Sequence, residues 1–465
     1  MNSNSNLRAI AMAILIIVSL VPFHGFAQDS EPAAGEQQPR KSTGRFPEDV
    51  EGLEAMANQA IEEDNALRLL QTTILLRRQQ PYAPRHLVNM VRAYAMMERP
   101  TSAYNYMLQM QQQGLTYDFD QLEQASVLQG TEVYDYLNDL LIRAGDPAGE
   151  AELAFEIDSD HAMPSAIAWD ESRQRFLVGT ARDGTLLAID EDGSVSKLLA
   201  ATEENGLWSI LDIAVDAGNN RLWLSSAGLP QFEAYDDGDA GPTGLFEFEL
   251  DSLEPVGRYL VPADGIDHGL GAIAIAPGGD VYAADRLSAT LYRKKADSDV
   301  IAPFLVDKEL NGFTDIAISP TGARIYLADA DRGVLVVDPQ NETAVMLESE
   351  DSLNQGGIEA LFHTGQELIL IQSGIQPQRL MALKLDPSGG AVEEIRPMAI
   401  ALPLFKGLSR GTIRGGTVYY FAEDSVADPE VEIGDVSILK TSLSAGATII
   451  PVDMKKFQDE NLNKN

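Results

Sequence analysis

Three acidic residues recur at the start of short apolar segments in the second half of the chain. Asp212 opens Asp-Ile-Ala-Val-Asp, Asp315 opens Asp-Ile-Ala-Ile-Ser, and Glu359 opens Glu-Ala-Leu-Phe. If these carboxylates converge near Arg410, they could bind calcium or a cationic or polyhydroxy ligand. The alternative is that each carboxylate caps a strand end or bonds a backbone amide, which is common turn chemistry. We favour this structural role and keep the four residues as the candidate site.

The segments that carry these residues belong to a sixfold repeat. Each unit holds a short apolar strand with a small residue at its middle, a turn, two further strands and a weaker fourth one. The first strands start about 43 to 60 residues apart, at Ile167, Ile213, Ile273, Ile316, Ala360 and Gly411. Six such units predict a mainly β fold, a six-bladed β-propeller over residues 151–451. The alternating segment Ala151–Asp158 is expected to close the ring as the outer strand of blade six.

The preceding residues, 47–145, have a helical pattern of apolar residues. Leu87, Met90, Tyr94, Ala103 and Met107 fall at the spacings of a tetratricopeptide (TPR) repeat, although Val91 replaces its usual small residue. The pattern therefore predicts an N-terminal α-helical, TPR-like domain before the propeller. A small irregular helical bundle is the alternative. Residues 28–46 read as a disordered linker and residues 452–465 as a polar tail.

The repeats resemble six-bladed propellers of the gluconolactonase and regucalcin type, with NHL-like repeats as relatives. That resemblance implies a Glu, an Asn and an Asp around a central channel, holding a divalent metal that polarises a lactone carbonyl. The Glu and Asp are expected two residues before the apolar residue that opens an inner strand. In this register the chain has no carboxylate, only Ser165, Leu211, Gly271, Thr314 and Ile358. A shift of one residue gives Asp212, Asp315 and Glu359 as the possible calcium ligands.

Other motifs give weaker signals. Gly407–Gly411 matches the G-x-S-x-G pattern of a hydrolase nucleophile, but a strand follows it and no histidine lies downstream. The acidic run Asp236–Gly241 lacks the spacing of an EF-hand loop. His161, His268 and His363 near the blade starts would need a carboxylate beside them to hold zinc, and isolated hydrogen-bonded histidines are commoner.

The first 27 residues carry one charged side chain, Arg8, followed by the apolar run Ala9–Val21. This is typical of a cleaved signal peptide of a bacterial exported protein. The chain has no cysteine, hence no lipoprotein anchor and no disulfide. We expect a periplasmic or secreted protein with no integral membrane segment after cleavage.

Charge excludes one class of partner. The chain has 34 Lys and Arg against 71 Asp and Glu, a formal charge of −37, so nucleic acid is not an expected partner. With family-type metal ligands missing in register, we expect a binding or assembly scaffold without catalysis, for a periplasmic protein partner or a small ligand. No cofactor is expected, although calcium is possible. The alternative is a calcium-dependent sugar-lactone or ester hydrolase.

Overall fold

The fold is described from a computed structural model. It describes residue 47 and residues 49–158, 163–191, 193–230, 232–235, 242–307, 310, 312–329, 331–350, 352–423 and 435–448. The proposed signal peptide, the linker 28–46, the acidic run Asp236–Gly241, His161 and the tail 452–465 all lie outside these described residues. None of the described helices is long and apolar enough to cross a membrane.

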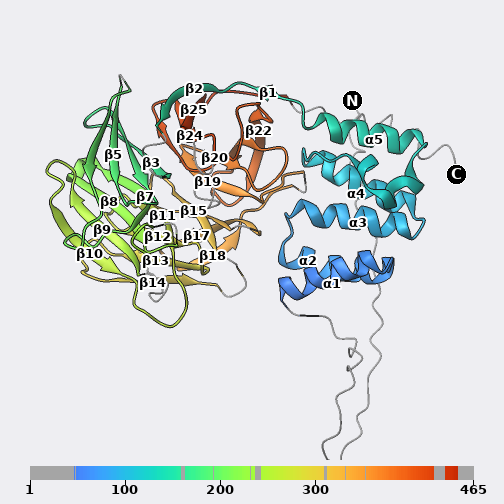
Figure 1. Cartoon of the computed structure of the whole chain (residues 1–465), viewed down its shortest axis with the longest axis horizontal. Helices are drawn as coiled ribbons and strands as arrows, with labels where there is room; N and C mark the ends of the chain where they lie inside the picture. Colours follow the sequence, from blue (N-terminus) through green and yellow to red (C-terminus); the bar gives the residue numbers. More distant parts are fainter. Residues whose placement is uncertain are drawn as a thin grey trace, which may run out of the picture. The chain divides into compact units, whose positions relative to one another are not determined.

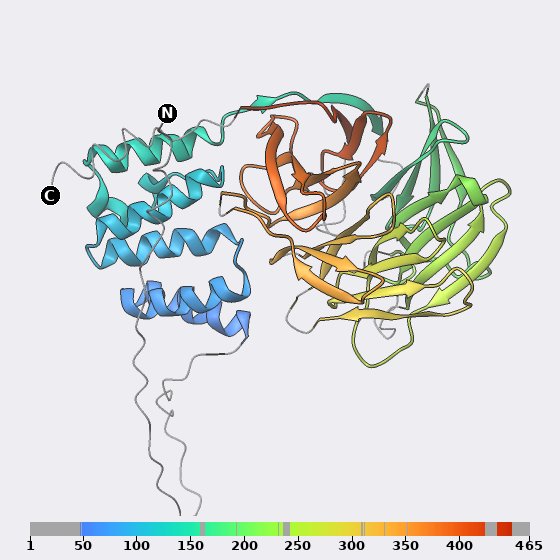
Figure 2. The ribbon, with the colours of Figure 1, turned by 180° about the vertical axis from the view of Figure 1, so that it is seen from behind.

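The first described part of the chain is helical, as predicted. Figure 2 shows its helices stacked one after another, from blue to teal. Capping fits the sequence: Asp49 and Thr131 accept hydrogen bonds from first-turn amides, and proline opens α3 and α4. The helices are α1 (Val50–Glu62), α2 (Ala66–Gln79), α3 (Pro84–Met96), α4 (Pro100–Gln112), η1 (Phe119–Gln121), η2 (Glu123–Leu128) and α5 (Glu132–Arg143).

The predicted packing of α3 against α4 is present. Leu87 and Val91 of α3 share one buried cluster with Ala103 and Met107 of α4. Ala103 has no exposed surface, and its small side chain allows the two helices to approach closely. In the segment after α4, two short 3-10 turns precede the single helix α5.

The rest of the described chain forms six antiparallel sheets arranged around a common axis (Figure 1), which confirms the six-bladed propeller. The inner strands of blades one to five contact one another in turn, and the inner strand of blade six contacts that of blade one. Blades one to three are β3 (Pro164–Asp170), β4 (Arg175–Thr180), β5 (Leu186–Asp190), β6 (Val195–Leu199); β7 (Ser209–Asp216), β8 (Arg221–Ala227), β9 (Thr243–Glu249), β10 (Pro255–Leu260); and β11 (Leu270–Ile275), β12 (Val281–Asp285), β13 (Thr290–Lys294), β14 (Ile301–Val306).

The last three blades follow the same order. The strands are β15 (Phe313–Ile318), β16 (Ile325–Asp329), β17 (Gly333–Asp338), β18 (Thr343–Met346); β19 (Ile358–Thr364), β20 (Glu367–Gln372), β21 (Arg379–Leu385), β22 (Val392–Ile400); and β23 (Gly411–Arg414), β24 (Thr417–Phe421), β25 (Val436–Ser442).

Ring closure is as predicted. Strand β2 (Glu152–Ile157) pairs antiparallel with β25 and completes blade six. Just before it, the two-residue strand β1 (Ala148–Gly149) pairs with β22 of blade five. The segment that leaves the helices therefore joins two neighbouring blades before the ring begins.

The inner strands of blades one to five share a β-bulge at the same place. One extra residue interrupts the pairing with the second strand in each, and a bulge of this kind redirects the side chains beside it. The extra residues are Ser165, Leu211, Gly271, Thr314 and Glu359. The same pairing places Leu361, not Ala360, in line with Ile167 and Ile316.

Candidate functional site

The bulge changes the alignment of the three predicted carboxylates. Asp212 and Asp315 follow the bulge residue, whereas Glu359 is the bulge residue itself. The sequence register was therefore off by one residue in blade five. The position where the resemblance implied a carboxylate holds Glu359 in this blade, not Ile358.

Arg410 connects three blades. It precedes β23, and its side chain reaches Asp315 of blade four, with Nη1 3.1 Å from Oδ1. Its Nη2 donates to the carbonyl oxygen of Gly271 in blade three, at 2.7 Å. Both side chains of the ion pair are 11% exposed. The structure thus brings the candidate site residues Arg410 and Asp315 together, with the guanidinium bound directly to the carboxylate.

Asp212 and Asp315 also bond backbone amides of the next blade. Oδ2 of Asp212 accepts from the N–H of Ile273 at 2.7 Å, and its Oδ1 accepts from its neighbour Ile213 at 2.9 Å. Oδ2 of Asp315 accepts from the N–H of Leu361 at 2.6 Å. Because Ile273 and Leu361 are equivalent in their strands, one contact joins blades two and three and the other joins blades four and five.

Two hydroxyl side chains at the bulge support the same blade junctions. Ser165 donates to the carbonyl oxygen of Ile210 at 2.5 Å, and Thr314 donates to that of Ile358 at 2.7 Å. Each bond crosses from one inner strand to the next. The residues at and after the bulge therefore hold the blades together around the axis, where the backbone would otherwise have unpaired polar groups.

Arg410 offsets part of the cost of burying the carboxylates of Asp212 and Asp315. Burial raises the pKa of Asp212 to about 7, Arg410 opposes that rise and the charge of Asp315 adds to it. Burial likewise raises the pKa of Asp315, against the effect of Arg410 and two backbone hydrogen bonds. Desolvation disfavours a carboxylate unless an opposite charge or donors are nearby. Arg410 supplies that opposite charge.

Glu359 has a different partner. It is 3.0 Å from Nη2 of Arg286, which belongs to the turn after β12. The glutamate side chain is 22% exposed and that of Arg286 45%, so this pair is partly open to solvent. We call the surface around Arg286 and Glu359 the rim of the propeller. Sequence reasoning did not find Arg286, because its only signal is a single basic residue after the second strand of blade three.

Calcium does not fit this arrangement of side chains. Calcium takes six to eight oxygen ligands, but amides and guanidinium groups already bind both oxygens of Asp212 and Asp315 and one oxygen of Glu359. Across the described residues, no three histidine or acidic side chains are grouped so that they could hold a metal ion.

Ser409 of the G-x-S-x-G pattern and His363 have contacts within the propeller. Ser409 donates to the carbonyl of Glu423 at 3.4 Å and is followed by β23, not by a helix. His363 is half-buried beside the ring of Tyr326, with centroids 5.4 Å apart. Neither residue forms a hydrolytic constellation among the residues that the structure describes.

A buried polar interface joins the helical part to blades four and five, and the sequence did not reveal it. Arg379 is 1% exposed, and its Nη1 donates to the carbonyl oxygen of Gln113 at 2.8 Å. Asn354 donates to the carbonyl oxygen of Tyr82 at 3.0 Å and to Oε1 of Gln113 at 3.1 Å. Isolated Arg, Asn and Gln residues carry no periodic signal.

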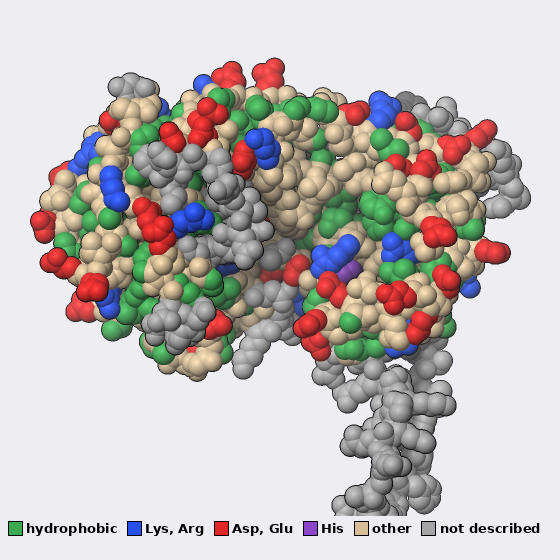
Figure 3. Space-filling view, in the orientation of Figure 1, with side chains coloured by type: hydrophobic (Ala, Val, Ile, Leu, Met, Phe, Trp, Pro, Cys, Tyr) green, Lys and Arg blue, Asp and Glu red, His purple; other side chains and the backbone are tan. Residues whose placement is uncertain are grey.

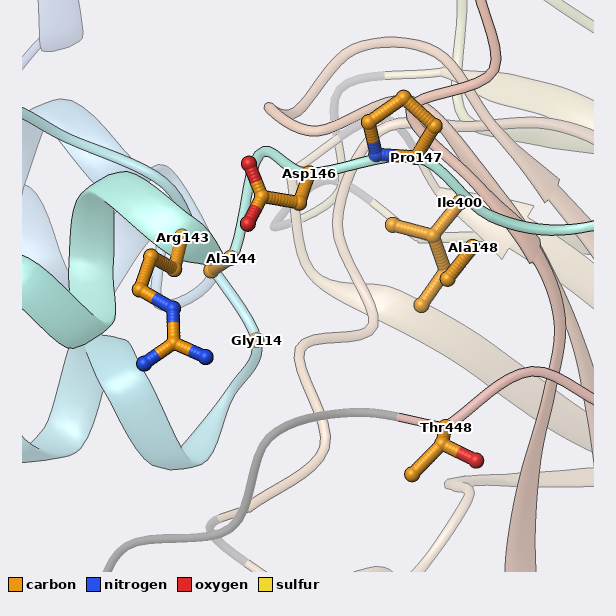
Figure 4. A pocket seen from close by; sticks show the side chains of 8 residues that line it. All are labelled: Gly114, Arg143, Ala144, Asp146, Pro147, Ala148, Ile400 and Thr448. Atoms are coloured by element: carbon orange, nitrogen blue, oxygen red, sulfur yellow. The ribbon is translucent and has the colours of Figure 1, made fainter.

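Two cavities lie along this interface. One of about 130 Å³ lies next to the rim, between residues 82–85 of the helical part and residues of the propeller that include Thr314 and Glu359. The other, of about 200 Å³, is shown in Figure 4, where Arg143 and Asp146 lie opposite Ile400 and Thr448. Both are composite, since neither part of the chain lines them alone.

Comparisons with known proteins show similarity of fold. No family model matches the sequence, and no curated protein matches it. Among solved structures, the calcium-binding protein regucalcin of Agrobacterium tumefaciens is 11% identical, with 64% of this chain and 98% of that chain covered and a TM-score of 0.43. A luciferin-regenerating enzyme is 12% identical, with coverages of 64% and 97% and a TM-score of 0.45. A protein provisionally named gluconolactonase is 12% identical, with coverages of 64% and 93% and a TM-score of 0.44.

Proposed function

We propose that this chain is an exported, periplasmic or secreted, binding scaffold that acts without catalysis and without a metal ion. Its helical part, TPR-like in sequence, and its propeller together present one recognition surface to a protein partner or a small ligand.

One observation carries the proposal: Arg410 lies among the carboxylates that a metal would need. A guanidinium cannot share an oxygen with a divalent cation without strong repulsion. The inter-blade amides use the other oxygens of Asp212 and Asp315. The charged groups nearest the axis therefore maintain the ring, and they leave the rim and the helical surface for recognition.

The interface between the two parts supports a common surface. Arg379 and Asn354 each bond the helical part from buried positions, so separating the two parts would leave buried polar groups without partners. The cavity beside Tyr82, Arg85 and Glu359 is formed by both parts. Pockets between domains are a common place for ligands.

Thermal unfolding with and without calcium distinguishes this proposal from the hydrolase alternative. We expect thermal unfolding of the mature chain to occur at the same temperature in EDTA and in excess calcium. Binding to the folded state at 100 times Kd would add about 2.7 kcal/mol, an easily measured shift. A calcium-dependent rise that Asp315→Asn abolishes, together with turnover of a sugar lactone or ester, would establish the hydrolase and refute the scaffold.

The recognition surface can be tested separately. Arg85 is 53% exposed and lines the smaller composite cavity, whereas Arg78, exposed on α2, lines neither of the two composite cavities. We expect a partner captured from a periplasmic extract to be lost with Arg85→Ala and retained with Arg78→Ala. Equal capture by both variants would place recognition elsewhere. Fractionation followed by N-terminal sequencing of the mature chain tests export.

A further inference from the structure

His268 lies between two carboxylates at the start of blade three. Its Nδ1 is 2.6 Å from Oδ2 of Asp285, at the end of β12, and its Nε2 is 3.1 Å from Oδ1 of Asp264. The imidazole is 7% exposed, Asp285 is fully buried and Asp264 is 54% exposed. The ring thus connects a fixed internal carboxylate to a carboxylate on a surface loop.

Asp285 accepts four hydrogen bonds in addition to its contact with His268. Its Oδ1 accepts from the backbone N–H groups of Gly269, Leu287 and Ser288, at 3.0, 2.9 and 3.1 Å. Its Oδ2 accepts from the hydroxyl of Ser288 at 2.9 Å as well as facing His268. A carboxylate has no hydrogen of its own to donate. Because this carboxylate only accepts, the hydrogen between it and His268 is on Nδ1.

The number of protons on the ring then decides the second contact. A neutral imidazole has one N–H, which Asp285 takes, so its Nε2 presents a lone pair to the carboxylate of Asp264. That arrangement is repulsive. Only the imidazolium donates to both aspartates.

We propose that His268 is a pH-dependent latch, which holds the loop 262–268 to blade three while the imidazole carries two protons and releases it when one proton leaves. The loop connects β10 to β11. Asp264 also accepts from the N–H of Ile266 at 3.1 Å, so the latch orders the turn that follows it.

The charged and titratable groups that face His268 are Asp264 on its own loop, Asp285 on β12 and Tyr292 on β13. Burial lowers the pKa of His268, but its hydrogen bonds to Asp285 and Asp264 and the negative charges of these two residues together raise it by more, so that it lies above its ordinary value. The Tyr292 hydroxyl is 3.3 Å from Nδ1, and burial raises its pKa to about 12, so it is uncharged throughout the range.

The sign of the pH effect follows. A histidine whose pKa is raised by folding contributes its full stabilisation below the unfolded value, about 6.5. That contribution is lost as the pH rises through the folded value. The latch is therefore closed at mildly acidic pH and opens toward alkaline pH.

The latch lies beside the rim. The turn that Asp285 holds contains Arg286, which pairs with Glu359, and Leu287, which is 54% exposed. A Cβ on Gly269 would be 3.3 Å from the Leu287 side chain, so the loop end lies against that residue. Ile266 is 59% exposed. Release of the loop therefore alters an apolar edge of the proposed recognition surface.

Hydrogen exchange of the full mature chain tests the latch. We expect the protection of the Ile266 amide, corrected for intrinsic exchange, to fall about tenfold for each unit by which the folded pKa of His268 exceeds 6.5, as pH rises. With Asp264→Asn the pH dependence should disappear, because an amide can accept from the imidazolium or donate to the neutral ring. Asp267→Asn, an exposed change in the same loop, is the matched control.

Imidazole NMR provides a second measurement. The midpoint of the His268 titration should match the loss of protection in the unmodified chain, and Asp264→Asn should lower it. A loop whose protection is independent of pH, or equally pH-dependent in Asp264→Asn and Asp267→Asn, would overturn the latch. Neither result depends on whether the scaffold proposal holds.

Discussion

Replacing Arg410 by methionine tests most directly what its bonds to Asp315 and Gly271 contribute to stability. The change keeps an apolar side chain of similar length but removes the cation that pairs with Asp315, whose side chain is 11% exposed. Breaking one partner of a buried ion pair costs about 3–5 kcal/mol. One hydrogen bond to Gly271 is also lost, so we expect a loss of about 4 kcal/mol near pH 8.

The pH dependence distinguishes this explanation from a simple packing defect. Without Arg410, the pKa values of Asp212 and Asp315, which burial already raises, rise further. An acid with a raised folded pKa destabilises the fold increasingly as pH rises above its unfolded value, about 3.9. The variant should therefore recover stability relative to the parent chain between pH 8 and pH 5.5.

Urea unfolding at both pH values measures this effect, and Asp315→Asn in the Arg410→Met background completes the comparison. Removing the unpaired charge should restore part of the lost stability at pH 8 but little at pH 5.5. Equal destabilisation by Arg410→Met at both pH values, with no recovery in the double variant, would refute the electrostatic reasoning.

Two further predictions concern the closure of the ring and the interface between its parts. Ile157 of β2 has no exposed surface, so Ile157→Ala should lower the free energy of unfolding by about 2–5 kcal/mol, whereas Leu153→Ala, at a 49% exposed position of the same strand, should change it little. Equal effects in urea unfolding would contradict the pairing of β2. Arg379→Met should cost about 1–3 kcal/mol for each buried carbonyl left unpaired and should increase protease cleavage between the helices and the propeller. The exposed change Arg78→Met should do neither, and unchanged cleavage in Arg379→Met would contradict the bridging role.

The sequence was sufficient to predict the propeller because each blade repeats the same apolar alternation. It also predicted closure by Ala151–Asp158, since that segment alternates with no partner of its own nearby. It placed Asp212 and Asp315 at equivalent positions, but misaligned Glu359, because Ala360 was taken as the residue that opens the inner strand of blade five, where the strand pairing has Leu361. The bond of Arg379 to Gln113 joins residues far apart in the chain, and those of His268 to Asp264 and Asp285 depend on the shape of a loop and a turn, so no apolar periodicity records them.

Strand β2 has a consequence for how the chain is made. It leaves the ribosome before any complete blade, yet its partner β25 is among the last described segments, with Glu152 opposite Lys440. During synthesis β2 therefore has no pairing partner until β25 has been made. Pairings between such distant segments form slowly, and exposed edges are open to wrong partners. The same strand that seals the finished ring thus makes the nascent chain most dependent on protection until synthesis ends.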